Sequence, residues 1–335
     1  MTQPMRGSTT PLDHAYDAAL VDLAGVPYRG PHPVPEAAPA LVAARAAGMR
    51  IVFVTNNASR GADEVARHLT GVGIDASPAE VMTAGQAAAR MLEGKVAPGA
   101  KVLVVGGTGL RAVIEERGFV VVDSADDHPA AVVQGWHPDV GWRQLAEAAY
   151  AVRDGAYFLA TNLDLTLPND RGLAPGNGSL VQAVVTASGV EPDSAGKPAP
   201  AMFHQAAALV GSKAPLVIGD RLDTDLAGAN AAGFAGLLVL TGVSSARDAV
   251  LAAPFERPTF IGETIAALGQ SHPRAERHGD WWQVGQATAK AVKGELTVAG
   301  PGGIDAIRAA CAAAWAAADE GDQVHVESLP SLALQ

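Results

Sequence analysis

The sequence of 335 residues predicts an α/β protein, a doubly wound parallel sheet with a second α/β domain inserted into it. Apolar stretches of strand length alternate with helical stretches at the start of the chain, and this alternation returns after residue 190. A second alternating block lies between these two parts. Strand–helix–strand connections cross over in the right-handed sense and give parallel strands, so a parallel sheet is expected.

The sequence predicts two strands and three helices in the first part of the core. The strands are Ala18–Leu23 and Arg50–Thr55, both mostly apolar, as is typical of parallel strands that are buried on both faces. The helices are Glu36–Ala47, Arg60–Val72 and Pro78–Leu92. The third helix is predicted to begin at its proline, because the first helical turn tolerates a residue that lacks an N–H.

The insert and the second part of the core continue the alternation. In the insert, the predicted strands are Lys101–Val105, Val120–Val122, Ala130–Gln134 and Ala156–Ala160, and the predicted helices are Leu110–Arg117 and Val140–Arg153. The order that follows is helix Ala199–Val210, strand Leu216–Ile218, helix Asp223–Ala232 and strand Gly236–Leu240. The predicted division is core (1–83), insert (84–189), core (190–270) and a C-terminal extension of unknown role (271–335).

The composition of the chain changes at Pro273. Arg274–Trp282 is predicted to be a polar joint that ends in two indoles. It is followed by a predicted strand at Leu296–Ala299, a helix at Ile304–Ala318 and a strand at Gln323–Val326. The two indoles have alternative uses, either docking the extension onto its own core or forming a homodimer contact, and the first is favoured.

Charge and cysteine content exclude several classes of function. The chain has 24 Lys and Arg against 35 Asp and Glu, and its net charge of -11 argues against general binding of nucleic acid or anionic membranes. A small phosphorylated metabolite in a local pocket is compatible with this charge. The single cysteine, Cys311, cannot form a disulfide within the chain. The sequence shows no secretory signal and no apolar run of about 18 residues, so a cytoplasmic protein is expected.

Two aspartates at the ends of apolar strands suggest a metal site. Asp22 ends the first strand of the core, and Asp220 follows Leu216–Ile218. The carboxyl ends of parallel strands meet at one edge of the sheet, where open α/β sheets bind ligands. Two carboxylates there can share Mg²⁺, which prefers oxygen ligands. Either aspartate alone is better explained as a cap of a helix or turn, but the pair favours the metal site.

Two further segments offer groups for a phosphate. Thr55, Asn56 and Asn57 follow a strand, and hydroxyl, amide and backbone N–H groups at such a turn suit phosphate oxygens. Lys197 is held between a glycine and a proline, where a fixed cation can neutralise phosphoryl charge. Taken singly, the turn is better explained as an N-cap cluster and the lysine as a solvated loop residue.

The order of these motifs resembles that of the haloacid dehalogenase superfamily of phosphatases. The motifs are Asp22-x-x-Gly25, Thr55-Asn56-Asn57, Lys197-Pro198 and Gly219-Asp220-x-x-x-x-Asp225. The insert resembles the cap of the class IIA branch, which includes nitrophenyl phosphate and glycerol phosphate phosphatases. The resemblance covers about residues 16–268 and does not reach the extension.

The resemblance implies a Mg²⁺-dependent phosphomonoester hydrolase whose inserted domain is a cap over the active site. Asp22 is implied as the nucleophile, which forms an aspartyl-phosphate. The implied metal ligands are Asp22, the Ala24 carbonyl and Asp220, with Asp225 in support, and the implied phosphate ligands are Thr55, Asn56, Asn57 and Lys197. Within the branch, glycerol phosphate is the favoured substrate.

Ala24 departs from the pattern of the family. The family has an aspartate at this position, whose carboxylate protonates the leaving group and activates water, a contribution of about 10²–10⁴-fold. Ala24 keeps the backbone carbonyl, so metal and phosphate binding are expected to survive while turnover is impaired. The favoured interpretation is a real phosphatase whose acid was removed by a deliberate substitution. The alternative is a catalytically silent pseudophosphatase that binds a phosphate ligand or regulates a partner.

Three further features have weaker claims to chemistry. Gly107–Ala112 follows a strand and opens a helix, like a dinucleotide fingerprint, but Asp123 is nearer than the ~20 residues usual for the acidic partner. For His137, contact with substrate and simple exposure in a loop are the alternatives. Asn162 and Asp164 either serve the joint between cap and core or provide ordinary turn chemistry.

Overall fold

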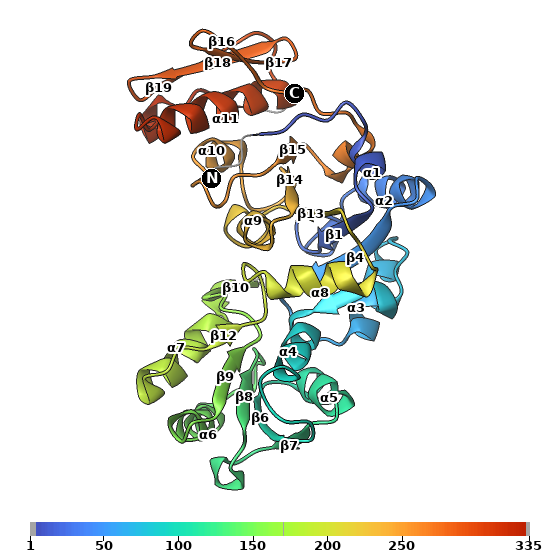
Figure 1. Ribbon diagram of the computed structural model, residues 1–335, viewed down its shortest axis with the longest axis vertical. Helices are drawn as coiled ribbons and strands as arrows, with labels where there is room; N and C mark the ends of the chain where they lie inside the picture. The colour runs from blue at the N-terminus through green and yellow to red at the C-terminus, as the bar shows by residue number, and fades with distance from the viewer. Residues whose placement is uncertain (1–4, 170, 333–335) are drawn as a thin grey trace. The chain divides into compact units, whose positions relative to one another are not determined.

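The computed structural model describes residues 5–169 and 171–332, and it has the predicted α/β fold (Figure 1). The chain divides into two compact units. The first contains the chain up to Phe53, Thr70–Asp75 and the chain from Ala207 onward. The second contains Val54–Leu69 and Ala76–Ala206.

The sheet of the first unit brings distant parts of the sequence together. Its strand order is β15 (Phe260–Gly262), β14 (Ala235–Val239), β13 (Pro215–Gly219), β1 (Ala18–Asp22) and β4 (Arg50–Thr55). The first four of these strands pair in parallel. Nearly every residue of β1 and β13 is buried, as expected for strands that are covered on both faces.

Short helices and one hairpin complete the core of the first unit. They are α1 (Leu12–Ala15), α2 (Ala37–Ala46), α9 (Ala227–Ala232), α10 (Ala246–Val250) and the antiparallel strands β2 (Tyr28–Arg29) and β3 (His32–Pro33). The predicted helix Asp223–Ala232 begins instead with a π-helical turn, Leu222–Leu226, which leads into α9. This wider turn carries Asp225, and π-turns are frequent at functional sites.

The C-terminal segment forms a small antiparallel sheet with one helix. The strand order is β16 (Glu276–His278), β17 (Trp281–Val284), β18 (Ala287–Val292) and β19 (Glu295–Ala299), and α11 (Ile304–Asp319) lies against this sheet (Figure 1). The predicted strand and helix correspond to β19 and α11. The predicted polar joint is wrong, because it contains β16 and the start of β17 paired as a hairpin.

The predicted strand at Gln323–Val326 is also wrong. The backbone N–H of His325 donates to the carbonyl of Gly294 at 2.8 Å, and the chain then turns into a short 3₁₀ helix, Val326–Ser328. Val324 is buried in the apolar core beside α11. Its burial explains the apolar signal in the sequence without a strand.

One apolar core joins the C-terminal segment to the parallel sheet. Leu238 of β14 and Ile261 of β15 belong to the same buried cluster as Ile307 and Trp315 of α11. The indole N–H of Trp315 donates to the carbonyl of Ala249 at 3.0 Å. Trp282 packs at the border of this cluster and Trp281 faces Lys290 of the same C-terminal segment, so docking of the extension onto the core by these two indoles stays a prediction.

The second unit is built on a five-stranded parallel sheet. The order is β12 (Asp193–Ser194), β9 (Tyr157–Ala160), β8 (Ala131–Gln134), β6 (Lys101–Val105) and β7 (Val120–Val122). The four strands predicted for the insert are confirmed to within one residue.

Helices cover this second sheet. The helices are α4 (Ala84–Leu92), α5 (Thr108–Glu116), α6 (Trp142–Arg153) and α7 (Asn177–Ser188), while α3 (Ala62–Gly71) and α8 (Ala201–Leu209) contain boundaries between the units. Apolar residues of β6, β8 and β9 share a buried core with α6 and α7. An antiparallel hairpin that the sequence did not predict, β10 (Thr166–Asn169) and β11 (Gly172–Pro175), follows β9.

The predicted helix Pro78–Leu92 is wrong over its first two turns. A 3₁₀ turn, Pro78–Glu80, is followed by the buried strand β5 (Val81–Thr83), and only then does α4 begin. Thr83 caps α4, because its side chain accepts from Gln86 N while Gln86 Oε1 accepts from Thr83 N. This reciprocal capping box starts the helix at residue 84.

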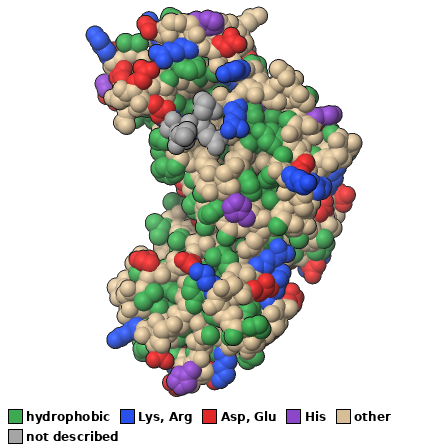
Figure 2. All heavy atoms as spheres, viewed as in Figure 1, with side chains coloured by type: hydrophobic (Ala, Val, Ile, Leu, Met, Phe, Trp, Pro, Cys, Tyr) green, Lys and Arg blue, Asp and Glu red, His purple; other side chains and the backbone are tan. Residues whose placement is uncertain are grey.

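The surface and helix lengths bear on the expected partners. On the face shown in Figure 2, basic and acidic side chains are interspersed within each unit. Such mixing differs from the single-sign stripe that nucleic-acid binding favours. Among the described residues, no helix combines the length and apolar character needed to cross a membrane.

Candidate active site

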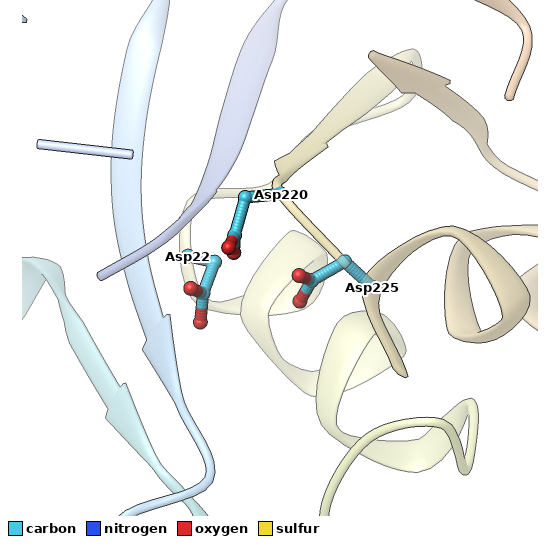
Figure 3. A group of neighbouring side chains, drawn as sticks. All are labelled: Asp22, Asp220 and Asp225. Atoms are coloured by element: carbon cyan, nitrogen blue, oxygen red, sulfur yellow. The ribbon is translucent and has the colours of Figure 1, made fainter. Parts of the chain in front are cut away.

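Three carboxylates meet at the carboxyl edge of the first unit's sheet. Asp22 ends β1, Asp220 follows β13, and Asp225 lies in the π-helical turn (Figure 3). One carboxylate oxygen from each lies within 4.8 Å of the others. The structure therefore brings Asp225 into the same cluster as the predicted pair.

The pairing of β1 with β13 explains how residues almost 200 positions apart come together. The strands are parallel neighbours, with Val21 opposite Ile218. Their carboxyl ends consequently share one edge of the sheet, and the aspartates that follow face the same space.

Burial makes this cluster a good fit for a cation. Asp220 and Asp225 are each 1% exposed, and Asp22 is partly buried. Like charges this close and this poorly hydrated repel one another unless a positive charge compensates them. A set of carboxylate oxygens is the donor type that Mg²⁺ prefers.

Asp223 lies in the same motif and is engaged differently. Its carboxylate accepts from Arg221 Nε at 3.0 Å and from Arg221 Nη2 at 2.7 Å. These hydrogen bonds to the guanidinium lower the pKa of Asp223 despite the opposing effect of its burial. Asp223 is therefore used in an ion pair beside the cluster.

A loop that carries none of the predicted site residues holds Asp220 in place. Thr241–Ser244 follows β14 at the same edge of the sheet. Val243 N–H donates to Oδ2 of Asp220 at 2.6 Å, and Ser244 N–H donates to the Asp220 carbonyl at 2.9 Å. At Gly242, a Cβ atom would overlap Oδ2 of Asp220, so only glycine fits. The sequence could have indicated this loop, because it follows the predicted strand Gly236–Leu240, and the carboxyl ends of such strands lie at the edge of the sheet where ligands bind.

The same loop supports the turn after Asp22. Thr241 Oγ1 donates to the carbonyl of Gly25 at 2.5 Å, and Gly25 N–H donates to the Tyr28 carbonyl at 2.7 Å. Gly25 has φ +90°, a backbone conformation that residues other than glycine rarely adopt. Ala24 is exposed in this turn, and its methyl group offers no proton donor or acceptor.

The predicted phosphate-binding turn lies in the second unit. Thr55 is 9% exposed, and its hydroxyl oxygen accepts from Asn57 N–H at 3.2 Å. The side-chain oxygen of Asn57 in turn accepts from the backbone N–H and the hydroxyl of Ser59, both at 2.8 Å. These contacts organise the turn between β4 and α3.

Lys197 is brought to this turn by Asn56. The backbone N–H of Lys197 donates to Asn56 Oδ1 at 2.8 Å, and its carbonyl accepts from Asn56 Nδ2 at 3.1 Å. Lys197 is only 4% exposed, so the interpretation as a solvated loop lysine is wrong. The predicted site residues thus form two groups, the three carboxylates in one unit and Asn56 with Lys197 in the other.

The residues with weaker claims to chemistry all contact neighbouring polar residues. Asp123, the acidic residue of the dinucleotide pattern, pairs with Arg111 at 2.7 Å. His137 lies 3.6 Å from the carboxylate of Asp139. Asn162 and Asp164 both hydrogen-bond to Asn56.

Comparison with known proteins identifies the family. A haloacid dehalogenase-like hydrolase model matches residues 19–120, and a HAD-hydrolase-like model matches residues 194–268. The D-glycerol 3-phosphate phosphatase of Mycobacterium tuberculosis is 46% identical over 308 residues, covering 90% of this chain and 86% of that protein. The chain belongs to the haloacid dehalogenase-like hydrolase family. The family predicted from the motifs is confirmed.

Other members show the same relationship. The acid sugar phosphatase of Staphylococcus aureus is 35% identical over 235 residues, covering 70% of this chain and 90% of that protein. The crystal structure of the Mycobacterium tuberculosis glycerol phosphate phosphatase in complex with magnesium matches with a TM-score of 0.84 and 45% identity, covering 92% of both chains. These similarities extend the family assignment to the whole fold.

Proposed function

We propose that this chain is a Mg²⁺-dependent phosphatase of small phosphomonoesters, with glycerol phosphate the favoured substrate. The observation that carries the proposal is the buried cluster of Asp22, Asp220 and Asp225. The magnesium complex of a 45% identical glycerol phosphate phosphatase supports both the metal and the substrate class.

The carboxylate cluster supplies the nucleophile and the metal ligands. Asp22, the Ala24 carbonyl and Asp220 would hold the cation, and Asp225 would support them. Bound Mg²⁺ would neutralise negative charge on the phosphoryl group as it is transferred. Asp22 attacks phosphorus, the bond to the leaving oxygen breaks, and an aspartyl-phosphate forms on Asp22. The hydrogen bond from Val243 holds Asp220 in a fixed orientation throughout.

The second group of residues would bind the phosphoryl oxygens. The hydroxyl of Thr55, backbone amides of the turn at Asn56–Asn57 and the ammonium of Lys197 would supply donors of the type that phosphate requires. We also propose the domain division of core (1–83 and 190–270), class IIA cap (84–189) and C-terminal extension (271–335). The cap would exclude water from the reacting groups and select the alcohol of the substrate.

Ala24 favours a second candidate function. Without a carboxylate at this position, the group expected to protonate the leaving oxygen and to activate water is missing. A chain that binds Mg²⁺ and phosphate but turns over slowly or not at all would serve as a phosphate-ligand binder or a regulatory pseudophosphatase.

Substitution of Ala24→Asp tests the two functions against each other. We expect a gain in phosphatase activity of about 10²–10⁴-fold, because the general acid and base is the missing group. The gain is expected to be larger for alkyl phosphates than for nitrophenyl phosphate, whose leaving group is stable as an anion. Steady-state assays of the parent, Ala24→Asp and Ala24→Asn measure it, the asparagine being the matched variant without a titratable proton. A folded Ala24→Asp variant that binds Mg²⁺ and remains inert on both substrates would favour the silent binder.

A further inference from the structure

The side chain of Asn56 is occupied by the protein itself. Its Oδ1 accepts from the backbone N–H of Lys197 at 2.8 Å, and its Nδ2 donates to the carbonyl of the same residue at 3.1 Å. The amide of Asn56 therefore pairs with both backbone groups of Lys197, as one strand residue pairs with another.

The same amide nitrogen reaches a second segment of the second unit. Nδ2 of Asn56 lies 3.2 and 3.3 Å from the two carboxylate oxygens of Asp164. An asparagine amide has two N–H bonds, and here one is directed to Lys197 and the other to Asp164. A phosphate oxygen, which needs a donor, could be bound by this side chain only if one of these hydrogen bonds were broken.

The turn that carries Asp164 is tied back to Asn56. Asn162 Nδ2 donates to the Asn56 carbonyl at 2.8 Å, and Asn162 Oδ1 accepts from Asp164 N–H at 3.2 Å. Asn177, at the start of α7, donates from Nδ2 to the Asn162 carbonyl at 2.7 Å. The turn at Asn162–Asp164 and the backbone of Lys197 thus both meet on Asn56.

Close packing leaves little freedom in this arrangement. A Cβ atom at Gly196 would lie 2.5 Å from the Thr161 carbonyl oxygen and 2.7 Å from Asn56 Oδ1. Glycine is therefore required for the backbone before Lys197 to approach Asn56. The backbone of Lys197 is therefore fixed by its hydrogen bonds to Asn56 and by the close packing of Gly196, which precedes it.

We propose that Asn56 is a positioning residue, which fixes the backbone of Lys197 and couples it to the turn at Asn162–Asp164. The role differs from the predicted one, in which the Asn56 side chain binds phosphate. It rests on the proposed function only in so far as Lys197 binds the phosphoryl group. A pre-oriented lysine binds its anion without the cost of ordering the loop at that moment.

Two variants test this role. Asn56→Ala removes both hydrogen bonds to Lys197. Asn230→Ala is the matched control, because Asn230 is also partly buried and donates from Nδ2 to two backbone carbonyls, those of Phe255 and Arg257 at 2.8 and 3.0 Å. Both variants lose side-chain hydrogen bonds to backbone groups of another segment. Only Asn56→Ala is expected to make Lys197 more mobile.

The first measurement needs no phosphate. Lysine acylation followed by peptide mass spectrometry is expected to show Lys197 protected in the parent, where it is 4% exposed, and labelled at least several-fold faster in Asn56→Ala. Asn230→Ala is expected to label Lys197 at the parental rate. Equal labelling of Lys197 in the parent and Asn56→Ala would overturn the positioning role.

The second measurement is a double-mutant cycle on the binding of inorganic phosphate with Mg²⁺ present, by calorimetry. Asn56→Ala is expected to weaken phosphate binding about tenfold, the loss of roughly one charge-assisted hydrogen bond. Because Asn56 acts through Lys197, the double variant with Lys197→Ala is expected to bind no more weakly than Lys197→Ala alone. Additive losses would mean that Asn56 binds phosphate directly.

The outcomes separate this inference from the proposed function. Binding of Mg²⁺ alone is expected to be the same in the parent and Asn56→Ala, because the carboxylate cluster is unaltered. If the parent with Mg²⁺ does not bind phosphate at all, the proposed function fails, and the labelling result alone then decides the role of Asn56.

Discussion

At the scale of single residues, glycines shape the carboxylate cluster as much as the aspartates do. Asp220 can occupy its position only because Gly25 and Gly242 leave space beside its carboxylate. Gly219 does the same for Asp225, whose side chain a Cβ atom there would overlap. The charge of the cluster comes from three residues, but its geometry depends on neighbours that carry no functional group.

This arrangement predicts the effect of Gly242→Ala. The added methyl group would displace the Asp220 carboxylate, so Mg²⁺ binding is expected to weaken at least tenfold while the chain remains folded. Calorimetry with Mg²⁺ and circular dichroism measure the two effects. Gly71→Ala is the control, because a Cβ atom there meets open space. Mg²⁺ affinity equal to that of the parent in Gly242→Ala would show that Asp220 is not a ligand.

At the scale of elements, a buried polar link joins α11 to the edge of the parallel sheet. Arg308 of α11 donates to the carbonyl of Ile261 in β15 at 2.7 and 2.9 Å, and its Nη2 lies 3.1 Å from Nδ1 of His272. Since the guanidinium can only donate, Nδ1 must accept, and Nε2–H donates to the Ala267 carbonyl at 3.0 Å. His272 is therefore neutral in this arrangement.

The link makes stability depend on pH. Burial and the nearby charge of Arg308 lower the pKa of His272 from 6.5 to about 4. In the unfolded chain His272 binds a proton as the pH falls below about 6.5, whereas in the folded chain it stays neutral until about pH 4. The free energy of unfolding is thus unaffected by this residue above pH 6.5 and decreases as the pH falls towards 4, by about 2–3 kcal/mol.

Urea denaturation of the parent and His272→Gln at pH 7 and pH 4.5 measures this contribution. Glutamine retains an oxygen that can accept from Arg308 and has no titratable proton. The loss of stability between the two pH values is expected to be smaller in the variant. Equal losses in both proteins would exclude His272 as the cause.

At the scale of the whole molecule, the C-terminal segment is part of the folding unit that contains the carboxylates. Trp315 is 4% exposed, packs in the cluster that includes residues of β14 and β15, and lies 5.5 Å from the guanidinium carbon of Arg257. The helix and the parallel sheet are expected to unfold together, because neither covers its apolar face without the other.

Trp315→Ala is accordingly expected to lower the free energy of unfolding by about 3–5 kcal/mol, the usual cost of removing a buried tryptophan side chain. Chemical denaturation followed by circular dichroism and by loss of Mg²⁺ binding is expected to give coincident transitions. Trp142→Ala serves as the control, since Trp142 is 77% exposed. A loss below about 1 kcal/mol in Trp315→Ala would mean that the segment folds independently.

The α/β class, most strands, the order of the motifs and the family could all be predicted from the amino-acid sequence. Strands such as Lys101–Val105 were predictable because burial on both faces makes the residues after the exposed first lysine apolar. Asp22 and Asp220 were predictable because acidic residues that end such strands meet at one edge of a parallel sheet. These are local patterns, and local patterns can be read along the chain.

Features that depend on residues distant in sequence are set by tertiary contacts. The strand Val81–Thr83 was missed because it is only three residues long and lies between a 3₁₀ turn and α4, whose start is set by the cap at Thr83. The joining of α11 to the parallel sheet, the loop that holds Asp220 and the two-sided pairing of Asn56 with Lys197 all require contacts between separate segments. Such contacts leave no periodic pattern in the sequence, because the two residues of each contact are close to each other only in the folded chain.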